Sequence, residues 1–124
     1  MTPILLSLIL TSVAMSAVAQ LVLKIGMSSE ATRMALQSGG MHAVIGVASN
    51  PFIWLGLGIY GLGTILWLGV LSKIDVSQAY PFVGLGFLLT MVFGLAFLGE
   101  QVSIQRIAGT LLVMAGVYLV ASSG

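Results

Sequence analysis

Four long apolar runs follow one another along the chain. They cover approximately residues 3–24, 52–71, 76–98 and 104–121, and the charges inside them are Lys24 at the end of the first run and Arg106 near the start of the fourth. Each run has about 20 residues, which is the length an α-helix needs to cross about 30 Å of hydrocarbon. The pattern predicts an all-α membrane protein whose residues 1–124 form a single four-helix transmembrane domain.

The segment between the first two spans has a different, mixed pattern. Glu30 and Arg33 come early, Ser38-Gly39-Gly40 interrupts the segment, and the apolar stretch from Met41 to Val47 is too short to span a bilayer. We therefore expect a loop at residues 27–50 that contains one short amphipathic or re-entrant helix. Asn50-Pro51 then predicts the start of the second span, with Asn as N-cap and Pro in the first turn.

The first span carries a row of polar side chains at every fourth position. This polar row consists of Ser12, Ser16, Gln20 and Lys24. Residues four apart share one face of a helix. Since an unsatisfied polar group is costly in hydrocarbon and a lysine at the centre of a span costs about 2.5–3.5 kcal/mol, the row should face protein, water or a ligand. It is the first candidate for a substrate-binding surface.

Glycines are frequent in the second span. Gly56, Gly58 and Gly61 match a dinucleotide-binding fingerprint, but they lie inside an apolar run with no preceding strand and no acidic residue about 20 positions on. Together with Gly63, they are better explained by close helix packing, because small residues allow helix backbones to approach one another in lipid.

The third span contains a weak point. Pro81 removes a backbone donor near its start, and Gly84 and Gly86 follow, so the helix should be kinked or pliable there. Gln78 and Tyr80 lie beside this point and are further candidates for substrate binding. The pattern fits a static kink required for packing and a hinge in a transport cycle equally well.

The fourth span has glycines two turns apart. Gly109 and Gly116 therefore lie on one helix face and are suited to a helix-helix contact, either with another span or with a second copy. Four short helices enclose little room for a solute, which favours a dimer. At the preceding turn, Glu100 is either a solvated turn residue or a partner of Arg106 or of a ligand.

Composition narrows the functional classes. The chain is 59% hydrophobic and 6% charged, with a mean hydropathy of +1.18, whereas an ordinary soluble domain has about 25% charged residues. The net charge is +1 with no basic block, so nucleic-acid binding is excluded. The sequence contains no cysteine, no catalytic triad, no pair of carboxylates and no cluster of metal ligands, and it implies neither an enzyme nor a cofactor.

The cations are unevenly distributed over the expected loops. Lys24, Arg33 and Arg106 fall on one side of four spans and Lys73 falls on the other. The positive-inside rule then favours chain ends outside the cytoplasm, although so small a bias also permits insertion in both orientations.

Several short motifs together resemble the drug/metabolite transporter superfamily, which is EamA-like. They are Ser16-x-x-x-Gln20-x-x-x-Lys24, Leu66-Trp67-Leu68, Ala79-Tyr80-Pro81, Gly99-Glu100 and Gly109-x-x-Leu112-x-x-x-Gly116-Val117. Within that superfamily, the small multidrug resistance exporters couple to protons through a glutamate eight residues before the terminal lysine of the first span. Here that position is Ser16, and the tryptophan expected three residues after Tyr80 is Val83. Proton-coupled export of the usual kind has thus lost its coupling group.

The sequence is more similar to the small subunits that flip aminoarabinose-linked undecaprenyl phosphate, with matches at Ser16, Gln20, Lys24, Tyr80 and Glu100 followed by Val102-Ser103. The resemblance implies a multi-pass transporter of the bacterial inner membrane, with a small multidrug resistance-like fold. It would act as a homo- or heterodimer with a similar subunit and translocate a polyprenyl-phosphate-linked sugar or a similar amphiphile. Lys24 would contact the phosphate. The alternatives are an accessory subunit of a membrane glycosyltransferase and a small-cation exporter.

Overall fold

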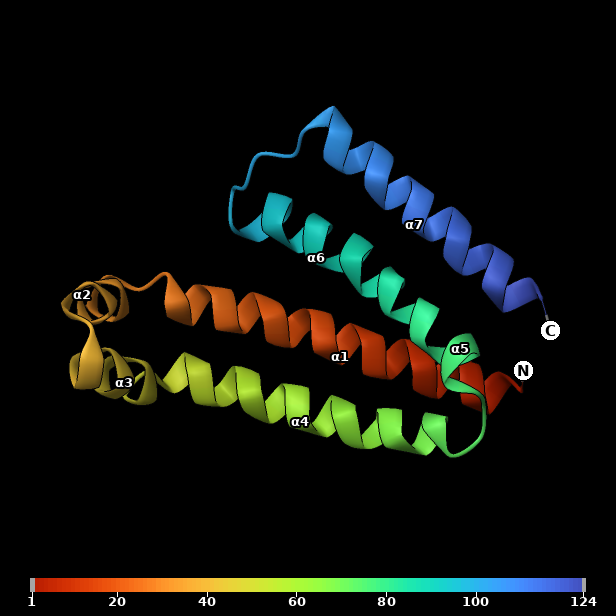
Figure 1. Ribbon diagram of the computed structural model, residues 1–124, viewed down its shortest axis with the longest axis horizontal. Helices are drawn as coiled ribbons and strands as arrows, with labels where there is room; N and C mark the ends of the chain where they lie inside the picture. The colour runs from red at the N-terminus through yellow and green to blue at the C-terminus, as the bar shows by residue number, and fades with distance from the viewer. Residues whose placement is uncertain (1, 124) are drawn as a thin grey trace.

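The structure is a computed structural model that describes residues 2–123, and it is built from helices joined by turns (Figure 1). In chain order the elements are α1 (Pro3–Met27), α2 (Glu30–Ser38), α3 (Gly40–Ala48), α4 (Pro51–Leu71), α5 (Val76–Ala79), the 3-10 turn η1 (Tyr80–Phe82), α6 (Val83–Phe97) and α7 (Ile104–Ser122). Four segments are long and apolar enough to cross a membrane: α1, α4, the combined segment Val76–Phe97, and α7. The predicted all-α protein with four membrane-spanning helices is confirmed.

Helix α1 is the centre of the bundle. It packs most extensively on α4 and next on α6, while α7 lies outside α6 and contacts only α6 and η1 to any extent within residues 2–123. The main apolar core lies at the end of the bundle where both chain termini are found. Ile9 of α1 and Val70 of α4 are fully buried there, beside Phe82 and Val117.

Glycines allow the close contact between α1 and α4. A Cβ on Gly56 would lie 2.7 Å from the Leu23 side chain, and a Cβ on Gly63 would lie 3.4 Å from the Ser12 carbonyl oxygen. Gly58 and Gly61 have open space at the same position. The close packing expected for the glycines of the second span therefore applies to Gly56 and Gly63, which face α1.

The segment between α1 and α4 forms two helices, where the sequence predicts one. Gly39 separates α2 from α3, and Gly40 begins α3; both have positive φ, 71° and 55°, a conformation that favours glycine. In Figure 1 both helices are seen nearly end-on, so they run across the ends of α1 and α4. Asn50 caps α4 as expected, and its side-chain oxygen accepts the Phe52 N–H at 2.9 Å.

The third span is interrupted at its proline. The chain changes from α-helix to a 3-10 turn at Tyr80–Phe82 and returns to α-helix at Val83. Pro81 lies in this turn, where its missing N–H interrupts the regular helical pattern. Gly84 is buried against Val113 and Val117 of α7, so this glycine allows α6 and α7 to pack closely.

Candidate functional site: a polar cavity between α1, α4 and α6

A cavity of about 640 Å³ lies between α1, α4 and α6. This volume is typical of small-molecule pockets, which hold about 300–1,000 Å³. Helix α1 contributes the polar row, and α4 and α6 contribute mostly aromatic and small side chains. The cavity therefore combines a largely apolar lining with a small number of polar groups, most of them on α1, which is the usual composition of a binding site.

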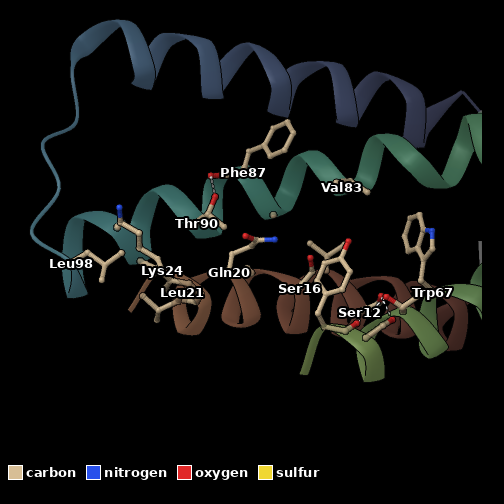
Figure 2. Close-up of a pocket in the computed structure, with 18 of the residues that line it drawn as sticks. Ser12, Ser16, Gln20, Leu21, Lys24, Trp67, Val83, Phe87, Thr90 and Leu98 are labelled. Carbon is tan, nitrogen blue, oxygen red and sulfur yellow. Dashed lines mark hydrogen bonds between the residues drawn. The ribbon is translucent and has the colours of Figure 1, made fainter. Parts of the chain in front are cut away.

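All four members of the polar row line this cavity. Figure 2 shows Ser12, Ser16, Gln20 and Lys24 following one another along α1 on the side that faces α6. Ser12 is buried, Ser16 is half-buried, and Gln20 and Lys24 are exposed. The four side chains thus pass from the interior of the bundle to the end of α1 that carries a positive charge.

Ser12 differs from the other three because its hydroxyl is already used. The Ser12 Oγ donates to the Gly63 carbonyl oxygen at 2.7 Å, in a buried contact between α1 and α4. A hydroxyl has one proton to donate, so Ser12 can offer a ligand only its remaining acceptor capacity. Its main contribution in this structure is to hold α1 against α4.

The residues around the broken third span divide between the cavity and the packing. Tyr80 and Gly86 line the cavity, whereas Gln78 and Pro81 are not among its lining residues. Gln78 was expected at the substrate, but it precedes the 3-10 turn on α5 and is half-buried away from the lining. Tyr80 is 63% exposed and contributes a phenol to the cavity lining.

Sequence reasoning did not identify several lining residues. On α4 these are Tyr60, Thr64 and Trp67, whose spacing of four and three places them on one helix face. On α6 they include Phe87, Thr90 and Phe93, also spaced by three. The spacing of these residues could have indicated a common face. It was not distinctive, because both spans are apolar on all sides and aromatic residues or threonines on one face do not stand out. The Thr64 and Thr90 hydroxyls donate to carbonyl oxygens of their own helices, Tyr60 at 2.9 Å and Phe87 at 3.0 Å.

The end of the cavity near Lys24 is completed by the turn after α6. Leu98 and Glu100 line it, and the Glu100 side chain lies directly against Gly94. Arg106, one of the alternatives considered for contact with Glu100, donates instead to the Gln101 carbonyl oxygen at 3.1 Å. In the part of the chain that the structure describes, no group of three or more His, Cys, Asp or Glu side chains is arranged to hold a metal ion.

Gly109 and Gly116 face away from the rest of the chain. Neither would bring an added Cβ within 4 Å of another described residue of the chain outside its own helix. Leu112, between them on α7, is 74% exposed. The face of α7 that carries these residues thus makes no contact with the other helices described.

Four helices long and apolar enough to span a membrane, three of which line a cavity with a polar row, are the features of a multi-pass membrane protein that binds a ligand between its spans. The sequence model of the EamA-like transporter family matches residues 3–122, so the chain belongs to the EamA-like transporter family. This membership agrees with the expectation from the sequence of a transporter and not an enzyme.

The curated relatives carry a more specific name. The chain is 36% identical over 75 residues to the probable 4-amino-4-deoxy-L-arabinose-phosphoundecaprenol flippase subunit ArnE of Pseudomonas savastanoi pv. phaseolicola, and the match covers 60% of this chain and 66% of the relative. It is 38% identical over 74 residues to the protein of the same name from Pseudomonas aeruginosa strain UCBPP-PA14, covering 60% of this chain and 64% of the relative.

A longer match exists to the probable ArnE of Pseudomonas paraeruginosa, at 33% identity over 97 residues, which covers 76% of this chain and 84% of the relative. The first two matches span slightly less than two thirds of the relatives' length. No solved structure matches the chain. The predicted resemblance to the aminoarabinose flippase subunits is confirmed at this level of similarity.

Proposed function

We propose that this protein is a flippase subunit that translocates a polyprenyl-phosphate-linked sugar across the bacterial inner membrane. The observation that carries the proposal is the polar row along the cavity, which leads from Ser12 to the ammonium group of Lys24. The names of the relatives support the substrate class, since they are flippase subunits for an amino sugar linked to undecaprenol through phosphate. They do not favour an accessory glycosyltransferase subunit or a cation exporter.

Lys24 supplies the contact that a phosphate needs. A lipid phosphate that moves through hydrocarbon is stabilised by a cationic hydrogen-bond donor, because charge-assisted hydrogen bonds are roughly twice as strong as neutral ones. Gln20 and Ser16 follow on the same helix face and offer neutral donors and acceptors to a sugar. The polyprenyl chain stays in the surrounding lipid. Pro81, Gly84 and Gly86 provide the pliable segment beside the site.

We further infer that the working unit is a dimer, with a second copy or a similar four-helix subunit. The face of α7 around Gly109 and Gly116 is suited to this contact because small residues let two helices approach closely in lipid. One chain already encloses about 640 Å³, which is more room than the sequence suggested, so the case for a dimer rests on this face of α7 and not on the size of the cavity.

The proposal is tested by lipid flipping in liposomes. The purified protein, alone and co-reconstituted with a similar four-helix subunit, is placed in liposomes containing a fluorescent polyprenyl-phosphate sugar, and accessibility of the label to an impermeant quencher is followed over time. We expect flipping by the wild-type protein and its loss in Lys24→Met. Lys73→Met is the matched control, since Lys73 lies in the turn between α4 and α5 and does not line the cavity.

The outcomes separate the alternatives. Full flipping by Lys24→Met would contradict the assignment of Lys24 to the phosphate. Equal losses in Lys24→Met and Lys73→Met would indicate a general effect of lysine removal. The absence of wild-type flipping in both preparations would argue against a flippase of this substrate class.

A further inference from the structure

The turn after α6 folds back on its own helix. Gly99 has a φ of 65°, which lets the chain reverse, and the Glu100 N–H then donates to the Gly94 carbonyl oxygen at 3.0 Å. The side chain follows the backbone, so the Glu100 carboxylate lies against the Cα of Gly94. A Cβ at position 94 would collide with the Glu100 Oε1, so only glycine leaves room for the carboxylate in this position.

The reversal brings Glu100 to the cavity. Glu100 lines it together with Gly94 and Leu98, and Lys24 lines it from the facing end of α1. Figure 2 shows Lys24 and Leu98 at the same end of the cavity. The two charged groups in the lining, one cationic and one anionic, are therefore gathered at one end of a site whose other lining residues are uncharged.

A turn residue that only contacts solvent would require neither the packing of its carboxylate against Gly94 nor a place in the cavity lining. The nearest cation in the sequence, Arg106, is directed to the Gln101 carbonyl oxygen at 3.1 Å and does not account for the position of Glu100. Gly94 is buried, and its missing side chain is filled by the carboxyl group of a residue six positions later. The turn thus places an exposed carboxylate at the cavity, packed against Gly94, with its oxygens available to a ligand.

We propose that Glu100 forms a subsite for an ammonium group, so that the cavity recognises a zwitterionic headgroup with a phosphate at Lys24 and a protonated amine at Glu100. This inference rests on the proposed function and assigns to Glu100 the discrimination between phospho-amino sugars, the class that the relatives' names print, and neutral phospho-sugars. An ammonium group on the sugar would donate to the Glu100 carboxylate in a hydrogen bond in which both partners are charged. A hydroxyl at the same position of the sugar would donate a weaker hydrogen bond, because only the carboxylate is charged.

Equilibrium binding tests the subsite independently of transport. The full-length protein in lipid nanodiscs is titrated with two short-chain polyprenyl phosphates that differ in one group, a 4-amino sugar and the corresponding 4-hydroxy sugar. We expect the wild-type protein to prefer the amino lipid by about tenfold, which corresponds to one hydrogen bond between charged groups. Glu100→Gln should remove this preference and leave binding of the hydroxy lipid unchanged.

Two further variants keep the test specific. Gly94→Ala displaces the carboxylate without removing it and should also abolish the preference, whereas Gly58→Ala, at a glycine with open space on α4, should retain it. Lys24→Met should weaken binding of both lipids to the same extent. An unchanged preference in Glu100→Gln, equal loss of both lipids in that variant, or no preference in the wild-type protein would each overturn the proposal.

Failure of this inference is distinguishable from failure of the proposed function. Wild-type flipping that treats both lipids alike would retain the flippase and exclude the ammonium subsite. A tenfold binding preference that depends on Glu100, in a protein that flips neither lipid, would retain the subsite and exclude translocation.

Discussion

Among single residues, Asn50 joins three segments of the chain. Its side-chain amide donates to the Gly26 carbonyl oxygen at 2.7 Å and to the Thr32 Oγ1 at 2.9 Å, while its oxygen caps α4 through Phe52. The residue is 8% exposed. The cap could be predicted, because Asn-Pro before an apolar run is a local signal. The bonds to Gly26 and Thr32 could not, since they span 24 and 18 residues and depend on where α2 folds.

Replacing Asn50 with Ala should therefore be costly. The substitution removes a helix cap and leaves the Gly26 carbonyl and Thr32 hydroxyl without this donor, which together correspond to about 1–3 kcal/mol of stability. Thermal unfolding in mild detergent measures the loss. Ser49→Ala is the control, because the Ser49 hydroxyl only donates to the carbonyl oxygen of Ile45 one turn earlier and should change stability by less than about 0.5 kcal/mol. Equal effects would contradict the junction assigned to Asn50.

At the scale of elements, α1 and α4 pack through selected glycines. Gly56 and Gly63 face α1 and Gly58 faces open space, although all three lie in the same glycine-rich span. The sequence could predict that glycines would serve packing, but not which ones, because α4 is apolar on every side and gives no direction to its buried face. On α1, by contrast, the polar row distinguishes one face from the others, so the sequence could predict which face lines the cavity.

We predict that Gly56→Ala destabilises the protein and Gly58→Ala does not. An added Cβ at position 56 would lie 2.7 Å from the Leu23 side chain and 3.2 Å from the Ala19 carbonyl oxygen, and overpacking of this kind costs about 1–3 kcal/mol. At position 58 the same methyl group meets open space, and the better helix propensity of alanine makes the change neutral or slightly stabilising. Thermal unfolding of the two variants distinguishes them, and a reversed order would contradict the packing described.

Residues 27–50 form two short helices, of which the sequence pattern predicted one. Met41 to Val47 is too short to span, and Gly39-Gly40 was identified as an interruption, but the sequence does not reveal that helices form on both sides of it. Both short helices are held by contacts with each other, including a close approach of Gly46 to Ala35. Such contacts are visible only once the chain has turned back at Gly39.

At the scale of the whole molecule, the most unusual feature is the exposed position of α7. Its buried contacts are confined to the side that meets α6 and η1, and the face with Gly109 and Gly116 has none among the described residues. The spacing of these glycines predicted a seam but could not assign its partner. The same is true of the cavity: its polar row was predicted, while the arrival of Glu100 depends on the reversal at Gly99.

If this face of α7 forms the dimer contact, Gly116→Leu should weaken association. A leucine there would keep the two backbones apart, because close approach at small residues is what stabilises such contacts. Chemical crosslinking in membranes, followed by electrophoresis, measures the dimer fraction, and we expect a loss of severalfold. Gly58→Leu is the control on the open face of α4. An undiminished dimer fraction in Gly116→Leu would exclude this face as the contact.

Photolabelling with a polyprenyl-phosphate sugar that carries a photoreactive group on the sugar shows where the headgroup binds. After illumination in membranes, mass spectrometry of the digested protein identifies the labelled residues. We expect label on α1 around Gln20 and Lys24 and on α6 near Thr90, with competition by the unlabelled lipid. Label confined to the outward face of α7, or insensitive to competition, would contradict the claim that this cavity holds the headgroup.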